Sequence, residues 1–178
     1  PKTDRGNTRP WQRNSFGLDL SAGYRFAVNM EHKAYLKPRA LVSAAQDLAV
    51  LDYRSITEPN LDATVELTAE REGAVHGLLV WFDAEIAEGL AYSNAPGEPE
   101  LVYGQMFLPL KGAPRLAAGE RIAARVRGTL VDGEYVWSWS WQVHGRDGAA
   151  RGALAQQSSF LSRVHSPTAI AKLSNQHS

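Results

Sequence analysis

The chain has 178 residues, of which 44% are hydrophobic, enough for one domain of ordinary size with a sizeable core. Its 19 Lys and Arg residues balance 19 Asp and Glu residues, so no charge excess directs it to nucleic acid or to an anionic membrane. The absence of cysteine excludes disulfides, thiolate zinc sites and a cysteine nucleophile, and it fits a reducing, cytoplasmic location.

The first part of the chain shows no steady alternation of apolar and polar residues. The sequence begins with Pro1 rather than Met, so we expect it to start inside a longer coding sequence or after processing. Residues 21–43 contain helix formers interrupted by Gly23 and Pro38. This composition predicts a helical or helix-turn arm, near the N-terminus, that projects from the rest of the domain.

Alternation begins after residue 61 and marks a predicted antiparallel β-domain. Residues 62–69 are expected to form a half-buried strand, and the denser apolar run 74–82 a strand that is buried on both sides at its end. Residues 102–110 form the next predicted strand, which Pro109 should end or place at an edge. Strands at this spacing, separated by Gly and Pro turns, predict a mainly β fold, a distorted antiparallel barrel or sandwich.

Residues 120–128 and 134–143 are predicted to form a hairpin around the turn pair Asp132-Gly133. The second strand of this hairpin carries three tryptophans at alternate positions, Trp137, Trp139 and Trp141. They share one face, whereas the opposite face is mostly polar, so the tryptophan face is predicted to point into the core. Exposed tryptophans in a row would instead suit a flat ligand such as a sugar.

Signals for catalysis or metal binding are sparse. The short signatures of dinucleotide, nucleotide-phosphate, zinc-protease and serine-hydrolase sites do not occur. The five histidines are scattered without a partner at metal-ligand spacing, so no metal site is predicted. The cluster Asp83, Glu85 and Glu88 suits acid-base work or a hard cation, but such residues at a strand end are more often simply solvated.

A second charged group lies on one face of the predicted strand 120–128. Arg121, Arg125 and Arg127 alternate with apolar residues and could meet an acidic partner. Alternating arginines on an outer strand face are usually just solvated, and no aromatic residues interleave them as a nucleic-acid platform would require. We therefore predict neither a nucleic-acid nor a membrane partner.

Five segments, taken together, resemble the C-terminal β-barrel domain of protein arginine methyltransferases and their bacterial relatives. In chain order they are residues 11–21, 76–86, 90–112, 116–128 and 134–143, so the resemblance spans roughly residues 10–143. The first segment fits the pattern W-x-x-x-x-[YF]-G-[FL]-D-[ML]. Each segment alone is a weak signal, and their order and spacing carry the resemblance.

The resemblance implies a two-domain parent enzyme. In this family a Rossmann-type domain that binds S-adenosylmethionine precedes the barrel, and a protein substrate binds in the groove between the two. The Rossmann-type domain is absent here, and with it the glycine-rich cofactor loop and the two catalytic glutamates. We therefore expect no catalytic residue, no bound cofactor and no methyl transfer in the chain alone; the family's direct transfer needs no metal.

The resemblance also assigns a dimerisation arm to residues 21–43. In the family this arm docks on the cofactor domain of a partner subunit, which implies a homodimer of the full-length protein. The candidate apolar contacts are Tyr24, Phe26, Met30, Tyr35 and Leu36. The alternative is that these side chains pack on the barrel itself.

A second family feature is a Thr-His-Trp loop beside the substrate pocket. Aligned on Gln105, this loop falls on Leu101, Val102 and Tyr103, so an aromatic residue persists while the Thr and the His are replaced. The family's histidine is part of the polar network of the active site. Its replacement by Val102 puts arginine specificity in question and leaves another methyl acceptor open.

The working hypothesis is a barrel domain, residues 1–161, that contributes the substrate groove and dimerisation arm of a bacterial S-adenosylmethionine-dependent methyltransferase. Residues 162–178 are expected to form a linker or the start of a helix, with Ser166 as the N-cap and Pro167 in the first turn. The alternative is a stand-alone β-sandwich that binds carbohydrate or protein through its tryptophans, Trp81 included. A third possibility is an interaction domain that kept the fold and lost the enzyme.

Overall fold

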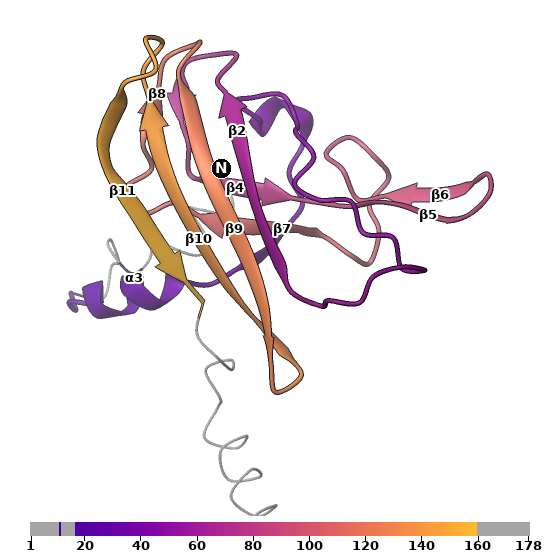
Figure 1. Cartoon of the computed structure of the whole chain (residues 1–178). Coiled ribbons are helices and arrows are strands. Elements are labelled where there is room, and N and C mark those ends of the chain that lie inside the picture. The colour runs from indigo at the N-terminus through magenta and orange to yellow at the C-terminus, as the bar shows by residue number, and fades with distance from the viewer. Residues whose placement is uncertain (1–10, 12–16, 160–178) are drawn as a thin grey trace, which may run out of the picture.

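The computed structural model describes residue 11 and residues 17–159, which form a mainly β domain of antiparallel strands (Figure 1). The helices are α3 (Ser21–Ala27) and a short 3₁₀ helix, η1 (Pro38–Ala40). The strands are β1 (His32–Ala34), β2 (Leu61–Thr68), β3 (Gly73–Ala74), β4 (Gly77–Val80), β5 (Asp83–Ala87), β6 (Leu90–Ser93), β7 (Gln105–Pro109), β8 (Arg115–Leu116), β9 (Arg121–Val131), β10 (Glu134–His144) and β11 (Ala150–Ser158).

Two sheets make up the body of the domain. The larger sheet has the strand order β11-β10-β9-β2, and the smaller one has the order β1-β7-β4. Two further pairs, β3-β8 and β5-β6, form small two-stranded sheets. In Figure 1 the smaller sheet passes behind the larger one, and the β5-β6 hairpin extends to the right. The predicted mainly β, antiparallel fold, a distorted barrel or sandwich, is confirmed. The described strands form an open, barrel-like arrangement and do not close into a continuous barrel.

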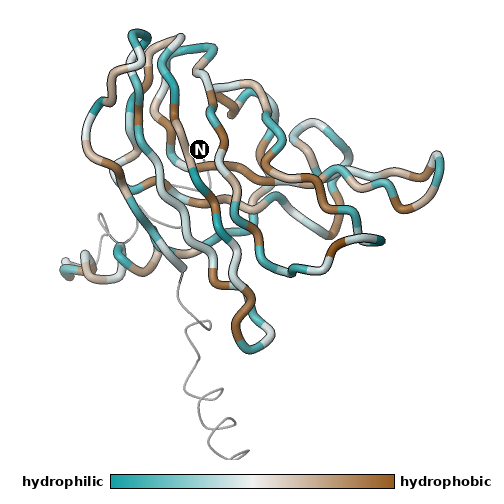
Figure 2. Tube along the Cα trace, in the orientation of Figure 1, coloured by the Kyte–Doolittle hydropathy of each residue, from teal (hydrophilic) through white to brown (hydrophobic). Residues whose placement is uncertain are grey.

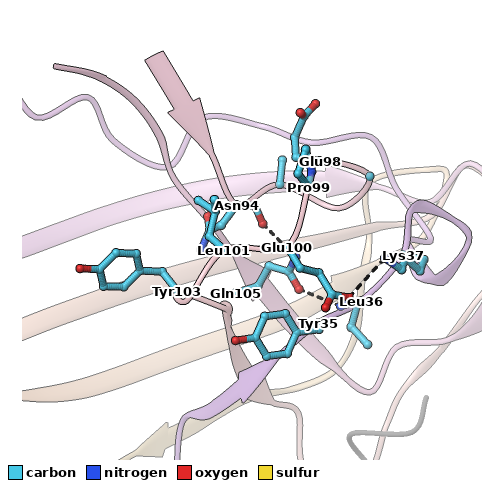
Figure 3. Close-up of a pocket in the computed structure, with 12 residues that line it drawn as sticks. Tyr35, Leu36, Lys37, Asn94, Glu98, Pro99, Glu100, Leu101, Tyr103 and Gln105 are labelled. Atoms are coloured by element: carbon cyan, nitrogen blue, oxygen red, sulfur yellow. Dashed lines mark hydrogen bonds and ion pairs between the residues drawn. The ribbon is translucent and has the colours of Figure 1, made fainter. Parts of the chain in front are cut away.

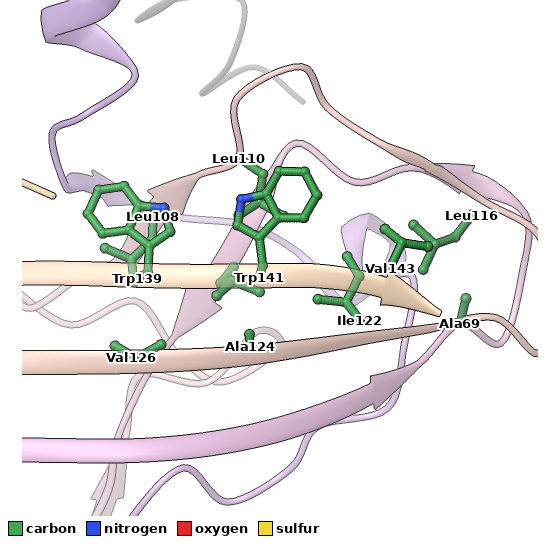
Figure 4. Close-up of a cluster of buried hydrophobic side chains, with 11 residues drawn as sticks. Ala69, Leu108, Leu110, Leu116, Ile122, Ala124, Val126, Trp139, Trp141 and Val143 are labelled. Atoms are coloured by element: carbon green, nitrogen blue, oxygen red, sulfur yellow. The ribbon is translucent and has the colours of Figure 1, made fainter. Parts of the chain in front are cut away.

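The core lies between these two sheets (Figure 4). From β9 it receives Ile122, Ala124 and Val126, the apolar residues that alternate with the arginines, and all are almost fully buried. They pack in one cluster with Leu108 of β7 and Leu78 of β4. The apolar face of β9 therefore packs on the opposite sheet, as the alternation of apolar and polar residues along this strand predicts.

The tryptophan face of β10 belongs to the same core. Trp139 is 2% exposed and Trp141 is 9% exposed, while Trp137 packs against the cluster from its edge. The Trp139 indole N–H donates to the carbonyl of Pro109 at 2.9 Å. A buried indole with a satisfied N–H is a packing residue, so the inward prediction is confirmed. Trp139 and Trp141 are not available as a stacking ladder for a carbohydrate.

The outer face of the larger sheet is polar and ion-paired. Arg125 of β9 donates through Nε and Nη2 to the two carboxylate oxygens of Asp62 on β2, at 2.6 Å each. Arg127 Nε donates to the same carboxylate at 3.0 Å. The hydrogen bonds from Arg125 first, with help from Arg127, lower the pKa of Asp62 to about 2. Arg121 pairs similarly with Glu66 at 3.4 Å. The arginines thus form the solvated outer face that the sequence indicated.

Several strand boundaries follow the predicted turn signals, and others do not. Asp132 and Gly133 have φ values of 50° and 83°, as a two-residue hairpin turn between β9 and β10 requires. Pro109 ends β7, as expected. The run 74–82, however, divides between β3 and β4, and its last residue, Phe82, is 36% exposed, so the prediction of an end buried on both sides is wrong. The chain there leaves the core and enters the β5-β6 hairpin.

The arm region contains the expected helix but does not project as a whole. After α3 the chain runs through β1, which pairs with β7 in the smaller sheet. Val28 and Ala34 are both 3% exposed. Gln157 of β11 donates through Nε2 to the carbonyl of Val28 at 2.7 Å. The expectation of a projecting segment over residues 21–43 is therefore corrected: apolar residues after α3 attach the chain to the domain.

Within the described part of the chain, none of the helices is long and apolar enough to cross a membrane. The same residues contain no cluster of three or more His, Asp or Glu side chains arranged to hold a metal ion. The predicted C-terminal extension, with Ser166 and Pro167, lies outside the described residues.

Candidate functional site

The loop between β6 and β7 and the segment that follows β1 line an open hollow (Figure 3). Its volume is about 270 Å³, part of which is open to solvent. The hollow unites residues that the sequence placed in two separate groups. Leu101, Tyr103 and Gln105 come from the predicted substrate-side loop, and Tyr35 and Leu36 come from the predicted arm.

Two buried side-chain amides, which we call the amide clasp, hold this region together. They belong to Asn94, which is 5% exposed, and Gln105, which is 6% exposed. Gln105 Oε1 accepts the Leu36 backbone N–H at 2.7 Å, and its Nε2 donates to the Asn94 carbonyl at 2.8 Å. Asn94 Oδ1 accepts the Phe82 N–H, and its Nδ2 donates to the Gly104 carbonyl, both at 2.8 Å. The clasp thus holds the backbone at four places. Its four hydrogen bonds also satisfy both buried amides, which lose their bonds to water when they are buried.

The tip of the loop is also tied to the segment around β1. Lys33 Nζ donates to the Val102 carbonyl at 2.5 Å, and the Tyr35 hydroxyl donates to the same oxygen at 3.3 Å. The Lys33 ammonium lies 5.4 Å from the Tyr35 ring centroid, within reach of a cation–π interaction. The Val102 side chain itself is 82% exposed. The backbone of the tip is therefore held while its side chains face solvent.

The ionisable groups of the hollow are exposed rather than poised for proton transfer. Lys37 Nζ pairs with Glu100 Oε1 at 3.4 Å, and both side chains are more than half exposed. Glu98 lies on the same loop and is exposed. An exposed pair of this kind contributes little to stability.

The other predicted arm residues lie away from this hollow. Tyr24 and Met30 are half-buried in and just after α3, and Phe26 on α3 is 51% exposed. The structure therefore divides the predicted arm contacts into two groups, one on the helix and one beside the loop. Phe26 and Tyr35, one from each group, both present large exposed hydrophobic surfaces.

The structure also shows where two further groups from the sequence lie, the acidic cluster and the histidines. Asp83 and Glu85 lie on β5 and Glu88 lies in the turn before β6, all exposed. Among the histidines, the His32 Nε2 lies 2.8 Å from the carbonyl of Ala27 and the His144 Nδ1 lies 3.2 Å from that of Gly148. These two rings are engaged with local backbone.

Sequence reasoning missed Asn94 and Lys33. Asn94 stands in the stretch Ser-Asn-Ala-Pro-Gly, where an asparagine predicts an ordinary turn. Lys33 has no local signal at all, because its partner Val102 is 69 residues away. Of the two amides of the clasp, only Gln105 was singled out in advance, through the resemblance.

No family model matches the chain. The arginine N(omega)-methyltransferase of Streptomyces achromogenes subsp. streptozoticus is 34% identical over 90 residues, which cover 50% of this chain and 25% of that protein. A chain of the Trypanosoma brucei PRMT1 enzyme-prozyme heterotetrameric complex with AdoHcy matches with a TM-score of 0.74 and 20% identity, over 89% of this chain and 52% of that chain.

The structural match shows the fold: the chain shares the barrel-like, antiparallel β architecture of about half of that solved chain. The match in sequence and the match in fold together confirm the resemblance to the barrel domain of protein arginine methyltransferases. The chain spans about a quarter of the length of the curated relative and about half of the solved chain.

Proposed function

We propose that the chain is the barrel domain of a bacterial, cytoplasmic methyltransferase of the protein arginine type, dependent on S-adenosylmethionine. The observation that carries this proposal is the 34% identity to an arginine N(omega)-methyltransferase over half of the chain. The fold adds support, because the solved neighbour belongs to a complex with AdoHcy.

In this proposal the chain contributes substrate positioning. The loop residues Leu101, Val102 and Tyr103, followed by Gln105, form the substrate-facing rim. Its support is the amide clasp, which holds the loop at both ends, and the exposure of Val102 and Tyr103 at its tip. The methyl donor and the catalytic groups would come from a domain outside this sequence, and the chain alone would not transfer a methyl group.

A second acceptor has specific support. The Streptomyces relative is an arginine N(omega)-methyltransferase, and the resemblance aligns Val102 with the family's loop histidine. Free arginine is therefore a candidate acceptor beside protein arginine.

The helix group of the arm is proposed to mediate dimerisation in the full-length protein. Phe26 is its most exposed member, at 51%, and an exposed aromatic is a common anchor of protein interfaces. Tyr24 and Met30 flank it on the same segment. The heterotetrameric neighbour shows that a chain with this fold can take part in an oligomer.

Methyl transfer is tested with the product of the complete coding sequence and radiolabelled S-adenosylmethionine. Arginine-rich proteins and free arginine are supplied in separate reactions, and the 178-residue chain serves as the control. Label on protein arginine supports the first acceptor and label on free arginine supports the second. Label on neither, from a folded enzyme that binds the donor, would refute the arginine assignment. Label transferred by the chain alone would refute its proposed inactivity.

A further inference from the structure

Lys33 of β1 reaches across to the loop between β6 and β7. Its register partner in the smaller sheet is Met106 of β7, and the loop comes just before that strand. The loop carries both hydrophilic and hydrophobic residues (Figure 2), and its tip contains Val102, whose side chain is 82% exposed. The Lys33 ammonium donates to the backbone carbonyl of Val102 at 2.5 Å. A lysine of the smaller sheet is therefore bonded to the backbone of an exposed loop tip.

The stem of Lys33 also fits closely against the loop. A Cβ on Gly104 would lie 2.8 Å from Lys33 Cγ and 2.7 Å from the carbonyl oxygen of Ala34, closer than real Cβ atoms approach. Glycine at position 104 thus lets the lysine stem pass directly along the loop backbone. The Tyr35 hydroxyl donates to the same Val102 oxygen at 3.3 Å, and the ammonium lies 5.4 Å from the Tyr35 ring centroid. A carbonyl, a glycine backbone and an aromatic ring together orient this one side chain.

Lys37 shows how this contact differs from an ordinary surface ion pair. Its ammonium pairs with the Glu100 carboxylate on the same loop at 3.4 Å, and both side chains are more than half exposed. Both ends of that pair are flexible side chains, so the pair restrains the loop backbone little. The Lys33 bond ends on a backbone carbonyl, and the amide clasp of Asn94 and Gln105 already holds the two ends of the loop. A charge-assisted bond at the tip therefore reduces the freedom that remains between the fixed ends.

We propose that Lys33 is a positioning residue for the methyl acceptor, acting through the backbone of Val102. The inference rests on the proposed function, in which Leu101, Val102 and Tyr103 form the rim that faces the acceptor. Tyr35, Leu101 and Tyr103 line the hollow beside this rim (Figure 3), so movement of the loop tip changes the surface that an acceptor meets. Lys33 does not itself line the hollow, which distinguishes it from groups that would touch the acceptor.

The holding of the loop is tested in the 178-residue chain by nitrogen-15 relaxation. Lys33→Met retains the length of the stem and lacks the donor, so the backbone order parameters of residues 101–103 should fall from about 0.85 to about 0.6. Lys33→Arg keeps a charged donor and should restore most of this order. Lys111→Met removes the same charge from an exposed lysine outside the loop and should leave the order parameters unchanged. Thermal unfolding midpoints should agree within about 3 °C, because the bond lies at the surface.

Acceptor positioning is tested in the complete protein, with protein arginine and free arginine as acceptors. Lys33→Met should raise the KM for the acceptor about five-fold, in line with one lost charge-assisted bond, while kcat and the KM for S-adenosylmethionine change less than about two-fold. The sign is informative, because an arginine acceptor is itself a cation. Loss of a nearby positive charge alone would lower the KM, whereas a loosened loop raises it. Lys33→Arg should return the KM to near the parent value, and Lys111→Met should leave it unchanged.

Unchanged order parameters in Lys33→Met would overturn the inference, since the bond would then not hold the loop. A loosened loop with an unchanged or lowered KM for the acceptor would overturn the positioning role. Equal effects of Lys33→Met and Lys111→Met would assign the change to net charge instead. Failure of the unmodified complete protein to methylate either form of arginine would refute the proposed function and the acceptor role together, and the relaxation data would still show whether Lys33 holds the loop.

Discussion

The Gln105 side chain donates from Nε2 to the backbone carbonyl of Asn94 at 2.8 Å, which joins the two ends of the loop between β6 and β7. The same side chain accepts the Leu36 N–H, so it also connects the loop to the segment after β1. A loop whose ends are fixed loses much of its conformational freedom. The buried amide of Gln105 therefore contributes to the placement of Leu101, Val102 and Tyr103, together with the bonds from Asn94 and Lys33.

Gln105→Leu should destabilise the domain and loosen the loop. It leaves the Leu36 N–H and the Asn94 carbonyl without their partner, at a cost of about 2–4 kcal/mol in the free energy of unfolding. Urea unfolding measures the cost, and hydrogen exchange should show reduced protection of the Leu36 amide. Gln105→Glu, which keeps the acceptor for Leu36, should retain more of that protection.

Gln142→Leu is the matched control for this change. Gln142 also donates to a backbone carbonyl, that of Gly152, at 3.2 Å, but near solvent on the outer face of the large sheet. Its replacement should cost less than about 1 kcal/mol, because water can replace the lost bond. A similar cost for both substitutions would mean that the clasp has no special role.

Asp62→Asn should reduce stability at neutral pH and have a diminishing effect in acid. The pKa of Asp62 is lowered from 3.8 to about 2 in the folded protein, chiefly by the hydrogen bonds from Arg125. A depressed pKa means that the stabilisation is fully present above the unfolded value, near pH 4, and is lost as the pH falls through about 2. Urea midpoints of the two proteins should therefore converge between pH 4 and pH 2.

The control for Asp62 is Asp47→Asn, at a carboxylate that forms no ion pair with the described residues. Its urea midpoint should follow that of the parent chain. A difference between Asp62→Asn and the parent chain that persists unchanged at pH 2 would contradict the assignment of the effect to the ionised carboxylate.

Trp139→Ala should be among the most destabilising single changes in the domain. Trp139 is 2% exposed and its indole N–H is bonded to Pro109, so truncation leaves a cavity and an unpaired carbonyl. The expected cost is about 3–5 kcal/mol. Ser138→Ala, on the opposite face of the same strand, should change the unfolding free energy by less than about 0.5 kcal/mol.

Tryptophan fluorescence should report a buried population of indoles. Trp139 and Trp141 lie in the core, whereas Trp11 is 40% exposed. Emission should be blue-shifted and only partly quenched by iodide, and added carbohydrate should not change it. Ready quenching of most of the emission would favour a ligand platform over a core.

Phe26→Glu should weaken self-association of the complete protein. Phe26 is 51% exposed on α3, and a buried charge at a subunit interface costs far more than at a free surface. Sedimentation of the complete protein measures the effect, with Tyr53→Glu as a control on another exposed aromatic. An unchanged association constant would remove the α3 group from the dimer interface.

The strands that were predicted correctly are those with two chemically different faces. Along β2, β9 and β10, apolar and polar residues alternate because one face packs on the smaller sheet and the other meets water. Strand β11 was missed because most of its residues are exposed, and its register comes from pairing with β10. Strand β1 has only three residues and depends on β7 for its hydrogen bonds. Such strands arise from tertiary pairing and leave little pattern in the sequence.

The candidate site shows the same limit. Leu101, Val102, Tyr103 and Gln105 were found because their segment resembles a known family. The clasp itself could not be predicted, since Gln105 and Leu36 are separated by 69 residues and neither carries a local sign of the other. The burial of Asn94 follows from the three-dimensional arrangement alone.

The hydrogen bonds of Gln157 on β11 limit which segments of this domain can be exchanged with those of its relatives. Its amide bonds the carbonyl of Val28 and the N–H of Lys111, at 2.7 and 2.9 Å, so an early segment of the chain, a central loop and the last strand meet at one side chain. A chimera that exchanges α3 without β11 would separate partners that fit each other. Segments 21–36 and 150–159 should therefore be transferred as a unit, although more than a hundred residues separate them in the gene.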